Sequence, residues 1–187
     1  MATLAVFGIG YVGVVSAACL AKDGHRVIAV DIDPAKVATI NAGRSPIVER
    51  GLAELIAEVT AAGLLTATTD ASAAILASDA SFVCVGTPGA EDGSIGLTYV
   101  KGVCEAIGRA LPAHRGFHSV IMRSTIVPGP MDSVCIPLPE QSSGLKAGRD
   151  FGVGYYPEFL RESTAIADCN DPGLIVFGAL DATPVRC

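Results

Sequence analysis

The stretch "LAVFGIGYVGVVSAACLA", Leu4 to Ala21, constrains the fold more than any other feature, because its 18 residues carry no charge. That length reaches the lower limit for a membrane span, and the small residues near its end are typical of a signal cleavage site. No Lys or Arg precedes the run, however, and Gly8, Gly10 and Gly13 interrupt it at G-x-G-x-x-G spacing. We therefore interpret the stretch as the opening of a nucleotide-binding fold.

The periodicity of the stretch changes at the glycines. Thr3 to Phe7 is a short β-type run, residues 11–22 are compatible with a helix that stops at Gly24, and "HRVIAVD" predicts a second strand that ends at Asp31. Strand, glycine turn, helix and strand with a terminal acid is the arrangement of a dinucleotide-binding βαβ unit.

Each residue of the motif has a physical task. Gly8 permits the tight turn, Gly10 lets backbone amides approach a pyrophosphate, and Gly13 allows close packing of the helix on the strand. The first N–H groups of the helix are available to the phosphates. Asp31 accepts hydrogen bonds from the adenosine ribose, and because a carboxylate repels a 2′-phosphate, it favours NAD over NADP.

Strands and helices continue to alternate along the chain. Further helices are expected over residues 33–43, 51–63, 70–78 and 97–111, and further strands over 64–69, 80–86, 118–124, 150–156 and 173–179. After Pro128 the sequence is otherwise expected to be irregular. The alternation predicts a Rossmann-like α/β fold, with a parallel sheet and helices on both faces. Ligands are then expected beyond the carboxyl ends of the strands.

Charge and cysteine usage narrow the classes of partner. The net charge of −6 disfavours nucleic acid or an anionic membrane, but not a small anion bound by backbone amides. The six cysteines include no C-x-x-C pair and histidine is sparse, so no metal site is expected. Because Cys19, Cys84 and Cys104 lie in apolar segments, we expect reduced thiols and a cytoplasmic location.

Six segments carry a resemblance to a known family. "FGIGYVG", "VDID", "SPIVERGL", "CVGTP", "RSTIVPG" and "PEFLRESTAIAD" follow one another along nearly the whole chain. In these segments the chain resembles the nucleotide-sugar 6-dehydrogenases, which act on UDP-glucose or GDP-mannose. "SPIVERGL" and "KAGRDFGVG" are closer to the GDP-mannose branch.

The resemblance implies an activity and a set of site residues. The family oxidises a sugar C6 alcohol through an aldehyde to a carboxylate in two NAD-dependent steps, with a cysteine that forms a thioester. By resemblance, NAD is held by the glycine motif together with Tyr11, Val12, Asp31 and Lys36. Thr87 and Thr125 are then placed near the nicotinamide and the reacting centre, and Glu158 and Glu162 are placed for proton transfer and for contact with substrate or cofactor.

Structural alternatives remain open for these residues. Glu158 and Glu162, with Arg161, could form a solvated helix face. Thr87 and Thr125 could be turn or capping residues, and Lys36 a surface lysine. Arg123 is expected to be a structural ion-pair partner.

The chain also departs from the family pattern. It contains no Gly-Gly-Ser-Cys segment, no counterpart of the catalytic Lys and Asn and no second domain, and Cys84 is expected to be an inert, buried thiol. Tyr156 replaces the usual Asn before "PEFL", and the closing "DATPVRC", which ends at Cys187, drifts from the pattern.

We therefore expect residues 1–187 to be the NAD-binding N-terminal domain of a longer enzyme. The sugar-nucleotide domain and the connecting helix would be absent, the full-length enzyme could be a homodimer, and the isolated chain would oxidise little or no nucleotide-sugar. A stand-alone NAD-binding module, or a different Rossmann dehydrogenase of small hydroxy acids or acyl thioesters, is the alternative.

Overall fold

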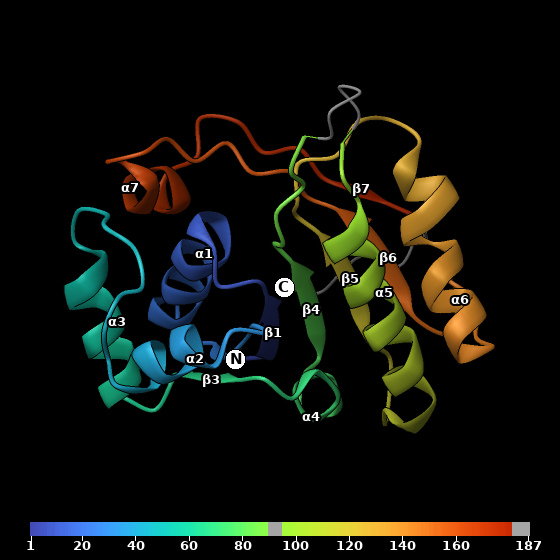
Figure 1. Cartoon of the computed structure of the whole chain (residues 1–187), viewed down its shortest axis with the longest axis horizontal. Coiled ribbons are helices and arrows are strands. Elements are labelled where there is room, and N and C mark those ends of the chain that lie inside the picture. The colour runs from blue at the N-terminus through green and yellow to red at the C-terminus, as the bar shows by residue number, and fades with distance from the viewer. Residues whose placement is uncertain (90–94, 181–187) are drawn as a thin grey trace.

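One sheet runs through the molecule. The computed structural model describes residues 1–89 and 95–180. Cys187 and the two acidic residues of the loop over 86–94, Glu91 and Asp92, lie outside these ranges. Within this part the strand order is β3-β2-β1-β4-β5-β6-β7 (Figure 1). The strands are β1 (Thr3–Phe7), β2 (Arg26–Val30), β3 (Leu65–Thr68), β4 (Ala80–Val83), β5 (Ser119–Met122), β6 (Gly152–Tyr155) and β7 (Gly178–Ala179).

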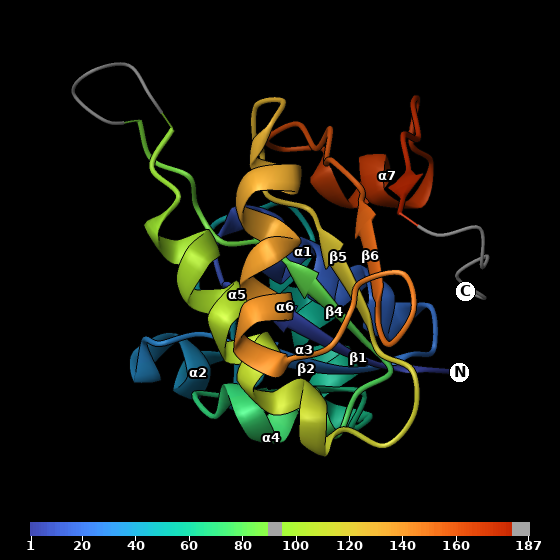
Figure 2. The same ribbon diagram turned by 90° about the vertical axis from the view of Figure 1, so that its right-hand side faces the viewer.

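Helices cover both faces of the sheet, as predicted (Figures 1 and 2). On one face lie α1 (Tyr11–Lys22), α2 (Pro34–Asn41), α3 (Leu52–Ala61) and α7 (Ala165–Asn170). On the other face lie α4 (Ala71–Leu76), α5 (Thr98–Ala110), the short turn η1 (Leu111–Ala113), the π-helix η2 (Met131–Cys135) and α6 (Pro137–Ser143). No helix of the described ranges is both long and apolar enough to cross a membrane.

Local signals set the ends of several elements. The side chain of Asp33 accepts a hydrogen bond from the Ala35 N–H at the start of α2, and Asp70 accepts one from the Ala73 N–H at the start of α4. The buried strands β1, β4 and β5 pair in parallel, as their continuous apolar runs indicate. The predicted order of strand, glycine turn, helix and strand at the N-terminus is therefore confirmed.

Two sequence expectations are wrong. The chain after Pro128 forms η2 and α6 rather than irregular structure, because Pro137 lies in the first turn of α6, where its missing N–H costs nothing, and Gly144 ends the helix with φ 74°. Residues 173–179 do not form a long parallel strand. Only Gly178–Ala179 pairs, and it runs antiparallel to β6 at the edge of the sheet.

A histidine is buried at the amino end of β5. The side chain of His118 is 1% exposed, and its ring nitrogens lie 2.8 Å from Ser81 Oγ and 3.0 Å from the Ser78 carbonyl oxygen. Burial lowers the pKa of His118 to about 4, with a smaller contribution from the neighbouring His114; the Ser78 hydrogen bond and the charge of Asp79 oppose that shift. The folded chain therefore holds this imidazole neutral.

This burial predicts a loss of stability in mild acid. Because the folded pKa lies below the unfolded value, protonation favours the unfolded chain, and stability falls as the pH drops from about 6.5 towards 4. We expect the free energy of unfolding in urea to fall by about 2 kcal/mol between about pH 7.5 and about pH 5. His118→Gln should remove most of this dependence, whereas His25→Gln should retain it; an unchanged pH dependence in His118→Gln would contradict the assignment.

Candidate functional site

A cavity opens where β1, β2 and β4 end and α5 begins. Its volume is about 690 Å³, and it is bounded by the glycine turn, the end of β2 and the first turns of α5. Four of the predicted cofactor residues line it: Gly8, Gly10, Asp31 and Lys36. An elongated cleft at the carboxyl edge of a parallel sheet is where this fold class binds dinucleotides.

The three glycines of the motif have different steric roles. Gly8 has φ 97°, a conformation that L side chains rarely adopt. A Cβ on Gly13 would lie 1.8 Å from the Gly8 carbonyl oxygen, whereas a Cβ on Gly10 would meet no atom within 4 Å. Gly8 and Gly13 therefore serve the fold itself, while the open space at Gly10 fits the close approach of a pyrophosphate.

The start of α1 is prepared for an anion. Gly10 is the N-cap residue, no side chain caps the helix, and its first turn holds no acidic residue. The first N–H groups of a helix have no partner within it, and they carry the positive end of the helix dipole. The backbone of Tyr11 and Val12 supplies these groups, so the predicted roles of both residues are compatible with the geometry through their main chain.

Asp31 lies at the end of β2 with a side chain that is 10% exposed. Its carboxylate accepts hydrogen bonds from the N–H groups of Ile9, at 2.6 Å, and Asp33, at 3.0 Å. Lys36 Nζ lies 3.6 Å from the same carboxylate. Lys36 is therefore more than an isolated surface lysine, since it places a positive charge beside Asp31 on the cavity wall.

The Tyr11 side chain does not line the cavity. Its hydroxyl donates a hydrogen bond to Oε2 of Glu49 at 2.7 Å. Glu49 lies in the connection between α2 and α3. Burial and this bond to a carboxylate raise the pKa of Tyr11 above its ordinary value. The side chain therefore joins elements of the fold, which the motif spacing could not indicate.

Glu49 is a residue that the sequence analysis missed. Besides the Tyr11 hydroxyl, its carboxylate accepts hydrogen bonds from the N–H groups of Ser163, at 2.9 Å, and Ala165, at 3.2 Å. Ser163 has φ 71°, the one positive value at a non-glycine residue in the described ranges. These hydrogen bonds hold the pKa of Glu49 below its usual range, and the bond from Tyr11 contributes most to that shift. Glu49 thus holds the segment before α7 against the start of α1.

The two predicted threonines lie together. The Thr87 hydroxyl donates to the Thr125 carbonyl oxygen at 2.8 Å, joining the loops that follow β4 and β5. Ser124 Oγ adds a second link to the same loop through the Val85 carbonyl oxygen, at 2.7 Å. The Thr125 side chain is exposed. Thr87 therefore has a turn-stabilising contact, whereas the Thr125 side chain stays accessible at the end of β5.

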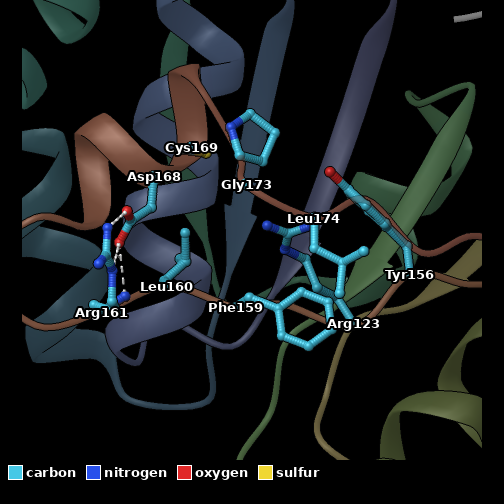
Figure 3. A pocket seen from close by; sticks show the side chains of 10 residues that line it. Arg123, Tyr156, Phe159, Leu160, Arg161, Asp168, Cys169, Gly173 and Leu174 are labelled. Atoms are coloured by element: carbon cyan, nitrogen blue, oxygen red, sulfur yellow. Dashed lines mark hydrogen bonds and ion pairs between the residues drawn. The ribbon is translucent and has the colours of Figure 1, made fainter.

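The alternative that placed two glutamates on a helix face is wrong. Residues 157–164 form no helix, and α7 begins only at Ala165. The carboxylate of Glu158 is half-buried and accepts the Leu160 N–H at 2.8 Å, while Glu162 is exposed in a turn. Arg161 pairs with Asp168, its Nη2 2.6 Å from Oδ1, rather than with either glutamate (Figure 3).

Arg123 also differs from its expected role. Its side chain forms no salt bridge within residues 1–89 and 95–180, and the guanidinium carbon lies 4.4 Å from the centre of the Tyr156 ring. The departure from the family pattern at Tyr156 therefore supplies the stacking partner of a buried cation. Cys84 matches its expectation, since burial raises the pKa of this thiol to about 12.

Comparison with known proteins places this geometry in a family. The model of the UDP-glucose/GDP-mannose dehydrogenase family, NAD binding domain, matches residues 2–186. The chain belongs to this family. NAD is accordingly its cofactor, and the open space at Gly10, the uncapped start of α1 and the Asp31 carboxylate fit that molecule.

Relatives from both branches of the family are similar to the chain. GDP-mannose 6-dehydrogenase of Pseudomonas aeruginosa is 51% identical over 178 residues, which are 95% of this chain and 41% of the relative. UDP-glucose 6-dehydrogenase of Haloferax volcanii is 44% identical over 176 residues, 94% of this chain and 40% of the relative. The chain thus spans about two fifths of the length of these enzymes.

A solved structure agrees with the fold. The ternary complex of the P. aeruginosa GDP-mannose dehydrogenase superposes with a TM-score of 0.94 at 50% identity, covering 95% of this chain and 41% of that one.

Within the described ranges, no group of three or more His, Cys, Asp or Glu side chains is arranged to hold a metal ion.

The glycine geometry makes opposite predictions for two alanine substitutions. Gly10→Ala should lose only about 1 kcal/mol of stability, because its Cβ meets open space and only the N-cap preference for glycine is lost, yet it should bind NAD at least about tenfold more weakly. Gly13→Ala should lose stability, because its Cβ lies 1.8 Å from a carbonyl oxygen. Thermal unfolding and calorimetric NAD titration measure both effects. Equal affinity of Gly10→Ala and the unchanged chain would refute the pyrophosphate role of this loop.

The contacts of Glu49 predict a local effect of its charge. Glu49→Gln keeps the shape of the side chain but removes the charge that strengthens three hydrogen bonds, so amides of Ser163 and Ala165 should exchange with solvent several-fold faster. Hydrogen exchange followed by mass spectrometry measures this, with Glu54→Gln on the exposed face of α3 as the matched control. Equal exchange in both variants would show that the Glu49 carboxylate does not hold this segment.

Proposed function

We propose that this chain is the NAD-binding, N-terminal part of a GDP-mannose 6-dehydrogenase, which oxidises the sugar C6 alcohol to a carboxylate. The observation that carries the proposal is the 51% identity to a GDP-mannose 6-dehydrogenase along 95% of the chain. The cofactor cavity, with its glycine turn and acidic end of β2, supports the redox half of this function.

Different residues of the cofactor site bind different parts of the dinucleotide. The backbone of Gly10, Tyr11 and Val12 binds the pyrophosphate, while Asp31 and Lys36 hold the adenosine end. NAD⁺ held by these residues would supply the hydride acceptor for both oxidation steps. Gly8 and Gly13 act by keeping α1 close to β1, so that the helix N-terminus faces the phosphates.

Three residues are proposed at the reacting centre. Thr125, exposed at the end of β5, is positioned by the Thr87 hydroxyl that donates to its carbonyl oxygen, and it contacts the nicotinamide side of the site. Glu158 is proposed to take part in proton transfer, and Glu162 to contact substrate or cofactor. Both glutamates lie on the segment that Glu49 holds against α1.

The remaining functions are assigned to the rest of a longer protein. The nucleotide-sugar site and the nucleophilic cysteine are proposed to lie there, since the buried Cys84 thiol, with its pKa raised to about 12, is unsuited to attack an aldehyde. We propose that the parent protein is a cytoplasmic homodimer and that this chain alone binds NAD without oxidising nucleotide-sugar. UDP-glucose is the second candidate substrate, favoured by the 44% identical relative.

The cofactor role is tested on the chain itself. We expect NAD⁺ to bind at least about tenfold more tightly than NADP⁺ in a calorimetric titration, because the Asp31 carboxylate repels a 2′-phosphate. The isolated chain should form no NADH with either nucleotide-sugar. Equal affinity for the two cofactors would contradict the role of Asp31, and NADH formation would contradict the assignment of the nucleophile to the rest of the protein.

The substrate is tested on the parent-length protein. GDP-mannose should yield two NADH per sugar, and kcat/KM should exceed that for UDP-glucose at least about a hundredfold. A preference for UDP-glucose would establish the second candidate instead. Absence of NADH with both would overturn the dehydrogenase assignment while leaving the cofactor titration unaffected.

A further inference from the structure

Two cysteines from distant parts of the chain are in contact. Cys19 lies in α1 and is 2% exposed, and Cys169 lies half-buried in α7. Where α1 packs on α7, the two thiols lie close enough for each to shift the pKa of the other. The same apolar cluster encloses both side chains. The pair therefore joins the helix that faces the cofactor to the helix that follows the proposed catalytic glutamates.

One member of the pair faces a cavity. Cys169 lines a hollow of about 330 Å³ whose wall also includes Arg123, Tyr156 and Asp168 (Figure 3). Arg123 is 6% exposed, and its Nε has no hydrogen-bond partner in the described part of the chain. The carboxylate of Asp168 is engaged by Arg161. A small reagent that enters this cavity therefore meets a cysteine beside a guanidinium that forms no ion pair with any carboxylate of residues 1–89 and 95–180.

The surroundings favour a thiolate at Cys169 rather than at Cys19. The neighbouring Cys19 thiol and, to a smaller extent, the charge of Arg123 lower the pKa of Cys169, while burial and the charge of Asp23 oppose the shift. The neighbouring Cys169 thiol and burial raise the pKa of Cys19. Because Cys169 lines the cavity with Arg123 whereas Cys19 is 2% exposed and lines no part of it, Cys169 is the thiol that a reagent reaches first, and the nearby cation favours its reactive thiolate form.

We propose that Cys169 is a peroxide-sensitive thiol and that Cys19 is its resolving partner, so that oxidation links α1 to α7. The Cys169 thiolate attacks one oxygen of hydrogen peroxide, the O–O bond breaks, and sulfenic acid and hydroxide form. The Cys19 sulfur then attacks the Cys169 sulfur and expels hydroxide, which takes up the Cys19 proton. Two thiols and one peroxide thus give one disulfide and two waters.

The molecule contains its own control for this chemistry. Cys104 in α5 and Cys135 in η2 also lie close enough for each to shift the pKa of the other, but they are only 0% and 2% exposed, within the core of the opposite face. Contact between two thiols is therefore common to both pairs. The cavity and Arg123 distinguish the pair of Cys19 and Cys169.

The test exposes the reduced chain to a small excess of hydrogen peroxide at neutral pH, blocks remaining thiols with an alkylating agent and maps linked peptides by mass spectrometry. The peptide linking Cys19 to Cys169 should form at least about tenfold faster than that linking Cys104 to Cys135. Cys19→Ser should accumulate sulfenic acid at Cys169, trapped by a dimedone-type probe, and Cys169→Ser should abolish both products. Peptide mapping also distinguishes these products from any disulfide formed by Cys187, which lies outside the described residues.

Two further measurements make the proposal refutable without relying on one variant. Arg123→Gln should slow alkylation of Cys169 at neutral pH at least about threefold, while Arg109→Gln at an exposed position of α5 should not. In the unchanged chain, the rate of Cys169 alkylation should rise with pH through an inflection below the ordinary thiol value of about 8.5. An inflection at or above that value, or equally fast oxidation of Cys104 and Cys135, would overturn the proposal.

Discussion

The close packing of α1 against the turn after β1 is the contact on which this domain depends. With no side chain on Gly13, the helix lies so near the Gly8 carbonyl oxygen that a single methyl group could not fit between them, and the first atom of the Cys84 side chain lies only 3.3 Å from the same position. This contact fixes where the helix begins. It therefore sets the direction in which the free N–H groups point, and it makes α1 the element against which α3 and α7 pack.

The features that could be predicted from the sequence are those whose cause lies within a few residues. The glycine turn and the acidic end of β2 each depend on neighbours in the chain, so both can be predicted without knowledge of the fold. The buried strands β1, β4 and β5 can also be predicted from the sequence, because a strand buried on both faces has a continuous apolar run. Together these features were sufficient to predict the fold class and four of the residues that line the cofactor cavity.

The features that could not be predicted depend on partners far away in the chain. Glu49 meets Ser163 across a separation of 114 residues, and nothing in the residues around either one indicates the contact. Arg123 was expected to find a carboxylate, but the tertiary structure places Tyr156 against it instead. Helix α6 is a different case, because its proline and glycine are helix-end signals that resemble loop composition until the segment between them is seen to pack on α5.

The two duties of Asp31 limit how the cofactor preference of this domain can be redesigned. Its carboxylate lines the cofactor cavity and also accepts a hydrogen bond from the N–H of Ile9, a residue of the glycine turn. A substitution that admits a 2′-phosphate therefore also removes an anchor of the loop that binds the pyrophosphate. Recognition of the ribose and shape of the phosphate loop are thus coupled through one side chain, and a designer who changes the first must rebuild support for the second.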